Sequence, residues 1–354
     1  MTIRRTTLAG AALAVIAVTA GCGSSGNGDS ASPSSSATGS APAAAAGPVG
    51  VSLPLLTSPF WTSYKDYVPA MADKLGVSTL EPVNADGKKD QQLTQIASLV
   101  SQGAKALVLS PLDSAAIKPA LDAAEAKNIP VVSVDVAPDG GKTFMVVRAN
   151  NRAYGQQACE FLGSKVTSGT VIQLEGDLAS INGRDRTEAF AECMKTKFPA
   201  LKVIGIATEW SGEKAQAGLL AAFTSNSDIK GIYSQAGGVF LAPTLTVLKS
   251  KGLLVPPTDA KHVFVVSNDG IKEELDAIRA GQLDATVSQP ADSYAEWGLY
   301  YAKAALEGKT FQAGPTDHGS TIVALPSGAL EDQLPAPLVT AANVDDPALW
   351  GNKK

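Results

Sequence analysis

The chain has 354 residues, a formal net charge of -5 and 45% hydrophobic residues. That hydrophobic content excludes a wholly disordered chain, and an acidic balance without a basic cluster argues against nucleic acid as a partner. Residues 49 to 354 are long enough for two lobes of ordinary size.

Residues 1 to 21 have the layout of an export signal, in which two arginines precede a short apolar run. The stretch V-T-A-G-C, residues 18 to 22, resembles a bacterial lipobox, although that pattern usually has leucine where this chain has Thr19. The resemblance implies that Cys22 carries lipid and anchors an exported protein to the outer face of the cytoplasmic membrane. The alternative is an export signal with an incidental cysteine.

Residues 22 to 48 are almost wholly serine, glycine, alanine and proline. Such a composition has too little apolar surface to offset the entropy lost on ordering, so it predicts a disordered tether. A lipid at Cys22 followed by this tether would hold a folded domain near the membrane.

From residue 49 onward, short β-branched runs alternate with stretches of helical periodicity. This alternation predicts an α/β fold with parallel sheets covered on both faces. The number of strands favours two doubly wound lobes, in which ligands lie beyond the carboxyl ends of the strands. The expected strands span 49–56, 77–83, 105–110, 129–135, 143–149, 169–175, 201–207, 229–234, 261–267 and 285–289.

The stretch S-P-F-W, residues 58 to 61, follows the first expected strand. Ser58 and Pro59 are typical of a helix N-cap and first turn. Phe60 and Trp61 lie about 100° apart around that helix, so both cannot point squarely into one core. At least one of the two rings should face the crevice.

Several other expected strands end in polar residues. Ser110, Asp135, Asp269 and Gln289 each follow an apolar run, and each alone is also explained by turn chemistry. Because the carboxyl ends of parallel strands share one edge, we expect these side chains to converge on a binding crevice.

The order of these motifs resembles the periplasmic sugar-binding proteins of ABC transporters, with the ribose-binding branch nearest. The motifs are S-P-F-W, L-S-P-L-D-S (109–114), N-I-P-V-V-S-V-D (128–135), N-N-R-A-Y-G (150–155), N-G-R-D-R-T-E-A-F (182–190), S-N-D-G (267–270) and A-T-V-S-Q (285–289). The resemblance implies the type I periplasmic-binding fold, in which two lobes are joined by a three-segment hinge.

The resemblance also implies roles for single residues. The rings of Phe60 and Trp61 flank a sugar, Trp210 forms another aromatic wall, Asp135 accepts from hydroxyls and Arg186 donates to them. Asp269 and Gln289 complete the polar shell. The other candidate contacts are Ser58, Ser110 and Asn150.

The implied domain boundaries place 49–149 and 290–320 in an N-terminal lobe. Residues 150–289 and 321–354 then form the C-terminal lobe and tail, with hinge crossings near Asn150, Gln289 and 318–321. The tail motif at 339–350 is interpreted as a strap that packs Trp350 onto a lobe.

Three positions depart from the ribose-binding pattern. Val136 stands where that branch has a second arginine, and Ala236 and Ser110 each replace an asparagine. We therefore expect a ligand with fewer hydroxyls on that side, an extra apolar substituent, or more bulk.

Two cysteines remain once Cys22 is set aside. In an exported protein, Cys159 and Cys193 are a reasonable disulfide pair, but two buried thiols in helices explain them equally well. We expect no metal and no cofactor.

The sequence favours a monomeric, lipid-anchored receptor that presents a small neutral sugar or polyol to an ABC permease. An enzyme is disfavoured because the chain has only two histidines, no G-x-S-x-G elbow, no metal-ligand spacing and no P-loop. Transcription regulators of the same fold need a basic helix-turn-helix where this chain has its signal and tether. A receptor for a non-sugar ligand that feeds a membrane sensor kinase stays open.

Overall fold

The computed structural model describes residues 47–353 of the chain. The expected export signal, Cys22 and the expected tether up to residue 46 lie outside the described residues. Among residues 47–353, no helix is both long enough and apolar enough to cross a bilayer.

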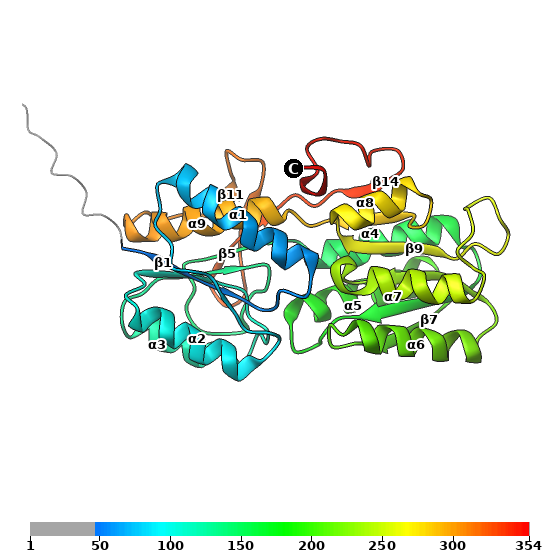
Figure 1. Ribbon diagram of the computed structural model, residues 1–354, viewed down its shortest axis with the longest axis horizontal. Helices are drawn as coiled ribbons and strands as arrows, with labels where there is room; N and C mark the ends of the chain where they lie inside the picture. Colours follow the sequence, from blue (N-terminus) through cyan, green and yellow to red (C-terminus); the bar gives the residue numbers. More distant parts are fainter. Residues whose placement is uncertain (1–46, 354) are drawn as a thin grey trace, which may run out of the picture. The chain divides into compact units, whose positions relative to one another are not determined.

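The first lobe is built on a sheet whose strand order is β11-β12-β13-β5-β4-β3-β1-β2 (Figure 1). All neighbouring strands in this sheet are parallel except at β12, which runs antiparallel to both of its neighbours. The strands are β1 (Val49–Leu53), β2 (Val83–Asn84), β3 (Ala106–Leu109), β4 (Val131–Val134), β5 (Met145–Ala149), β11 (Gly314–Pro315), β12 (Thr321–Ala324) and β13 (Leu330–Leu334). Its helices are α1 (Pro59–Leu75), α2 (Lys89–Ser101), α3 (Lys118–Glu125) and α9 (Ala291–Leu306).

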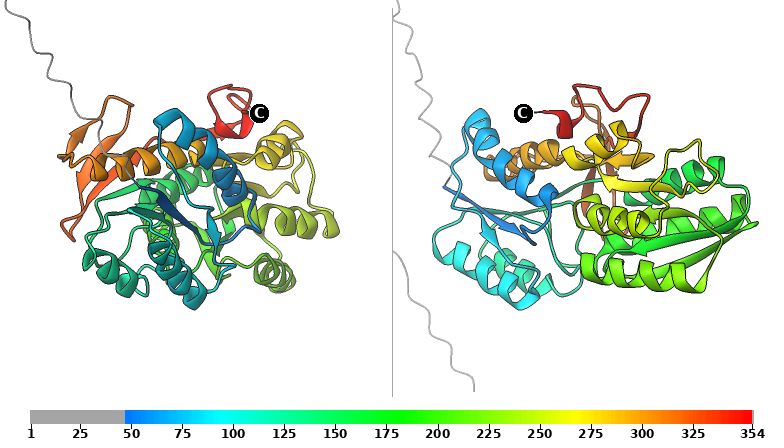
Figure 2. Two further views of the ribbon diagram at one scale, coloured as in Figure 1. Left: turned by 60° about the vertical axis from the view of Figure 1, so that its left-hand side comes forward. Right: turned by 45° about the vertical axis from the view of Figure 1, so that its right-hand side comes forward.

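The second lobe has the strand order β14-β10-β9-β8-β6-β7, in which only β14 is antiparallel to its neighbour. Its strands are β6 (Gly169–Glu175), β7 (Leu201–Ala207), β8 (Ile229–Ser234), β9 (Phe264–Asp269), β10 (Ala285–Ser288) and β14 (Leu338–Thr340). Its helices are α4 (Asn151–Lys165), α5 (Ile181–Lys197), α6 (Gly212–Ser225), α7 (Gly237–Ser250), α8 (Lys272–Arg279) and the short 3-10 helix η1 (Trp350–Asn352). Two mainly parallel sheets with helices on both faces confirm the predicted fold class (Figure 2).

The apolar strand runs are buried on both sides, as their composition predicts. In the first lobe, α1 and α9 pack on one face of the sheet, and α2 and α3 pack on the other. In the second lobe, α4 and α5 share one core, while α6, α7 and α8 share another. This rigid packing fixes the carboxyl ends of the strands, where the loops that carry polar side chains begin.

The third passage between the lobes differs from the prediction. The chain leaves the first sheet after β5, near Asn150, and returns to it after β10, near Gln289. The prediction that residues from 321 onward belong to the C-terminal lobe is wrong for 321–334, because β12 and β13 extend the first sheet from the edge of β5. The third passage therefore lies at 335–337, not at 318–321.

Cys159 and Cys193 form a disulfide that joins α4 to α5 inside the core of the second lobe. The two cysteines are 34 residues apart in sequence, so the bond closes a loop of that length and lowers the conformational entropy of the unfolded chain. Replacing both cysteines with serine should lower the free energy of unfolding by about 2–4 kcal/mol. Chemical denaturation with and without reductant measures this: reductant should destabilise the wild type and leave the double variant unchanged. Equal stability of the two oxidised proteins would contradict the expectation.

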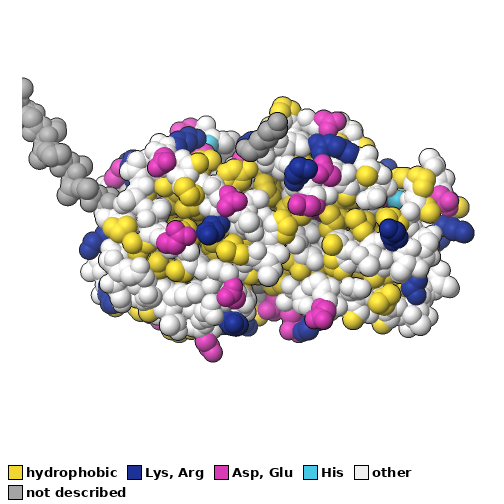
Figure 3. Space-filling view, in the orientation of Figure 1, with side chains coloured by type: hydrophobic (Ala, Val, Ile, Leu, Met, Phe, Trp, Pro, Cys, Tyr) yellow, Lys and Arg dark blue, Asp and Glu magenta, His cyan; other side chains and the backbone are white. Residues whose placement is uncertain are grey.

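Charged side chains on the surface are mixed in sign. On the face shown in Figure 3, lysine and arginine are interspersed with aspartate and glutamate, with no broad basic patch among the residues drawn in colour. Among the described residues, many charged side chains form exposed ion pairs, which contribute little to stability individually.

Candidate ligand-binding site

A hollow lies between the two lobes, at the carboxyl ends of the strands, and its empty space of about 590 Å³ includes space open to solvent. Its lining residues are Pro54, Leu55, Ser58, Phe60, Trp61, Ser110, Pro111, Leu112, Asp135, Val136, Ser180, Asn182, Arg186, Trp210, Ala236, Val239, Asp269 and Gln289. All the predicted ligand contacts except Asn150 line this one hollow.

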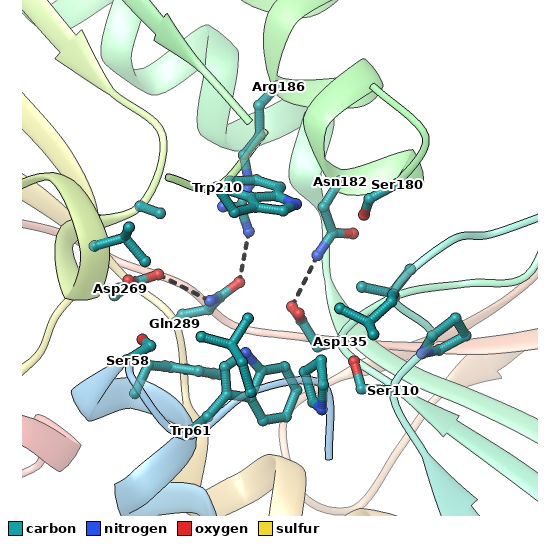
Figure 4. A pocket seen from close by; sticks show the side chains of 18 residues that line it. Ser58, Trp61, Ser110, Asp135, Ser180, Asn182, Arg186, Trp210, Asp269 and Gln289 are labelled. Carbon is teal, nitrogen blue, oxygen red and sulfur yellow. Dashed lines mark hydrogen bonds between the residues drawn. The ribbon is translucent and has the colours of Figure 1, made fainter. Parts of the chain in front are cut away.

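Two tryptophans face each other across the hollow (Figure 4). Trp61 comes from the start of α1 in the first lobe, and Trp210 comes from the loop after β7 in the second. Trp210 stacks on Phe240, with ring centroids 6.3 Å apart and planes inclined by 13°. Phe60 meets Trp61 edge to face at 5.2 Å and is itself 2% exposed, so it supports the wall as well as lining it.

Arg186 forms the polar centre of the hollow. Its Nε donates to Asn151 Oδ1 at 2.6 Å, Nη1 to the Gln235 carbonyl oxygen at 2.6 Å and Nη2 to Gln289 Oε1 at 2.8 Å. The guanidinium also lies 5.9 Å from the ring centroid of Trp210. Because a guanidinium has about five N–H donors and three are used, two remain for a guest.

Gln289 joins Arg186 to the carboxylate of Asp269. Its Nε2 donates to Asp269 Oδ1 at 3.1 Å, while the Gly238 N–H donates to Oδ2 at 2.8 Å. Burial raises the pKa of Asp269 to about 7, against the opposing effect of Arg186. Asp269 also has φ of 118°, a backbone conformation that non-glycine residues adopt only when their surroundings hold them there.

Asp135 and Asn182 form a second polar pair, which spans the two lobes. Asn182 Nδ2, on α5, donates to Asp135 Oδ1 at 3.0 Å. Burial raises the pKa of Asp135, although Arg186 and Arg148 favour its charged form. Sequence reasoning missed Asn182, but its spacing of four residues from Arg186 was a usable signal, because that spacing puts both on one helix face.

Three buried polar atoms in the lining have no partner among the described residues. They are Ser110 Oγ, Ser180 Oγ and Asn182 Oδ1. Buried polar groups are rarely left unpaired, so these atoms are available to hydroxyl groups of a guest or to water.

A model of the periplasmic binding protein domain matches residues 49–310 of the chain. The chain belongs to this family. The ribose import binding protein of Bacillus subtilis is 27% identical over 265 residues, covering 75% of this chain and 83% of the relative. The D-allose-binding periplasmic protein of Escherichia coli is 28% identical over 258 residues, covering 70% of this chain and 81% of the relative.

Solved structures share the fold of this periplasmic binding protein. A carbohydrate transporter solute binding protein from Agrobacterium radiobacter, in complex with D-arabinose, matches with a TM-score of 0.73 at 20% identity. The match covers 85% of this chain and 96% of the other. Family membership confirms the resemblance drawn from the sequence motifs.

In this periplasmic binding protein, Ser58 departs from expectation in one detail and Asn150 departs in its role. Ser58 occupies the expected N-cap position before α1 and lines the hollow as predicted, but its side chain makes no capping bond. Asn150 does not line the hollow; its side chain caps α4 by accepting from the Ala153 N–H at 3.1 Å. The prediction for Asn150 is therefore wrong, and its buried neighbour Asn151 contacts Arg186 instead.

The positions that depart from the ribose-binding pattern all border the hollow. Val136 and Ala236 line it directly, together with Val239, Pro111 and Leu112. Apolar side chains cannot form hydrogen bonds with hydroxyls, so this part of the lining favours the C–H surface of a ligand over its hydroxyl groups.

Proposed function

We propose that this chain is the extracytoplasmic solute-binding protein of an ABC importer. It binds an uncharged sugar or sugar-like polyol between its lobes and delivers it to the membrane permease. The observation that carries the proposal is the pair of facing tryptophans around a ring of Asp135, Asp269, Arg186 and Gln289. Relatives named for ribose and D-allose binding support it.

The chemistry of the hollow suits a sugar. A sugar ring has C–H surface that aromatic faces cover, and hydroxyls that need partners once water is excluded. Charged partners strengthen those hydrogen bonds. Anionic guests are disfavoured, because the lining has two carboxylates against one arginine.

Capture would proceed by hinge closure. The two lobes already meet beside the hollow, where the Ile181 N–H donates to Ser114 Oγ at 2.9 Å and Arg148 pairs with Asp185 at 2.8 Å. A guest that touches both lobes binds this closed arrangement more tightly than an open one, and that difference shifts the population.

The anchor and the assembly state belong to the same proposal. The lipobox-like stretch that ends at Cys22 supports a lipid anchor on the outer face of the cytoplasmic membrane. The protein acts as a monomer, because one chain supplies both walls of the hollow. The proposal includes no catalytic role, in keeping with relatives that are named as binding proteins.

A panel of pentoses, hexoses and polyols tests this function. We expect at least one neutral member to change tryptophan fluorescence and to raise the melting temperature. At a hundredfold its dissociation constant, a true ligand adds roughly 2.7 kcal/mol to the free energy of unfolding. A phosphorylated counterpart of the best sugar is the matched control and should bind far more weakly. The proposal fails if no neutral sugar or polyol gives a response.

A further inference from the structure

The C-terminal segment Trp350–Lys353, here called the C-terminal strap, lies across the junction of the two lobes. Figures 1 and 2 show it, in red, between the α1 and α9 pair and α8. It is not part of the lining of the hollow. Trp350 is nevertheless 5% exposed, so its large side chain is almost fully packed against other parts of the protein.

On the first lobe, the strap contacts both α1 and α9. The indole of Trp350 packs edge to face against Phe60, with ring centroids 5.8 Å apart. The Tyr67 hydroxyl donates to the Trp350 carbonyl oxygen at 3.5 Å, and Lys353 Nζ pairs with Asp292. Phe60 in turn lines the hollow, so Trp350 backs one aromatic wall from behind.

On the second lobe, the strap holds the turn after β9. Trp350 Nε1 donates to the Asp269 carbonyl oxygen at 3.1 Å, and the Gln289 N–H donates to the same oxygen at 2.9 Å. A Cβ on Gly351 would lie 2.3 Å from the Gly270 carbonyl oxygen, so strap and turn are in close backbone contact. Asn352 Oδ1 accepts from Arg279 Nη2 at 2.7 Å.

The turn that the strap holds is conformationally demanding. Asp269 has φ of 118° and Gly270 has φ of 75°, so the direction of the Asp269 carboxylate depends on an uncommon backbone geometry. The hydrogen bond from Trp350 to the Asp269 carbonyl oxygen fixes that peptide by a residue outside the lining of the hollow. Trp350 thus contacts one lining residue from each lobe without contacting the guest space.

We infer that Trp350 is a positioning residue for ligand binding, which sets Phe60 and Asp269 in their binding geometry at the hinge. The inference deepens the proposed function and rests on it for the identity of the guest. Preorganised contacts bind more tightly because less ordering is left to complete on association. Loss of Trp350 should therefore reduce affinity more than the loss of a similarly buried side chain that contacts neither Phe60 nor Asp269.

The test compares three variants by calorimetric titration with D-ribose, D-allose and D-arabinose. Trp350→Ala removes both contacts and should weaken binding about twentyfold or more. Trp350→Phe keeps the ring against Phe60 but lacks the N–H, and should weaken it about fivefold. The control is Leu349→Ala: Leu349 is similarly buried but packs only within the second lobe. The control should lose stability and keep its affinity within about threefold.

Hydrogen exchange on the ligand-free protein gives a second readout that needs no sugar. Trp350→Ala should speed exchange at the amides of Gly270 and Gln289 at least tenfold relative to Leu349→Ala. If the wild type binds no sugar, the proposed function fails, and this exchange result still decides whether the strap orders the turn. Equal exchange in the two variants, or an equal loss of affinity in both, overturns the inference.

Discussion

Replacing Arg186 with methionine should abolish measurable sugar binding and lower the free energy of unfolding by about 3–5 kcal/mol. The side chain is 2% exposed, and its guanidinium satisfies Asn151 Oδ1, the Gln235 carbonyl oxygen and Gln289 Oε1. Methionine has similar bulk but leaves all three acceptors buried and unpaired, and each such group costs about 1–3 kcal/mol. The substitution also removes the positive charge that stabilises the ionised forms of the buried Asp135 and Asp269.

Arg152 provides the matched control for that experiment. It lies on α4, is exposed, and pairs only with exposed Glu188 and Glu192. Arg152→Met should change stability by about 0.5 kcal/mol or less and leave affinity unchanged. Denaturant titration and calorimetry on both variants make the comparison. An Arg186→Met protein that binds sugar like the wild type would show that the binding site lies elsewhere.

Stability and affinity should respond to pH in opposite directions. Burial raises the pKa of Asp269 to about 7 and that of Glu274 to about 8. Both values exceed those of unfolded carboxyls, so the folded protein binds more protons between about pH 4 and 8. Unfolding free energy should therefore fall as pH rises through this window. Sugar affinity should rise about tenfold from pH 5.5 to 7.5, because an ionised Asp269 is the better acceptor for hydroxyls.

Asp269→Asn isolates the contribution of this carboxyl. An amide cannot ionise, and its single oxygen can accept from only one of the two donors, the Gly238 N–H and Gln289 Nε2, so affinity should fall about thirtyfold or more. The pH dependence of affinity should disappear, and the fall in stability should become shallower. Asp276→Asn is the control, because Asp276 is exposed on α8, the helix that follows the turn after Asp269, and its pKa is lowered, outside the window. If Asp269→Asn keeps the pH dependence of the wild type, that dependence arises from another titrating group.

Gln289 links these predictions to the mechanism of closure. It lies where the chain passes from β10 to α9, and its side chain bridges Arg186 and Asp269. The polar centre of the site is therefore attached directly to one of the interlobe passages. A guest that engages Arg186 or Asp269 acts on the hinge through this residue.

The binding residues predictable from sequence share one property: they follow apolar strand runs. Strands such as A-L-V-L and V-V-S-V can only be buried, and parallel strands bring their carboxyl ends to one edge. Ser110, Asp135, Asp269 and Gln289 meet in one hollow for that reason. The resemblance to a family then added Trp210, in the loop after β7, and Arg186, which lies on α5 away from the strand ends.

Other features depended on geometry finer than a sequence pattern resolves. Asn150 and Asn151 differ by one position, yet one caps a helix at the surface and the other is buried against Arg186. The expected strand at 77–83 is reduced to an isolated bridge at Thr79 and the short β2 at Val83–Asn84. Pro82 lies between them and has no N–H to donate to a ladder. A rotation of one residue about the helix axis separates Asn150 from Asn151, and one missing N–H donor interrupts strand pairing at Pro82.

The sequence by itself determined the two-lobe α/β plan, because burial of alternating strand and helix faces follows from local composition. Only the tertiary structure decided that Cys159 meets Cys193, that 321–334 extends the first sheet, and that Trp350 contacts both lobes. A thiol, a strand edge or an indole can pair with many partners. Which one it meets is set by the packing of the whole chain, since contacts distant in sequence form only where the folded backbone brings them within reach.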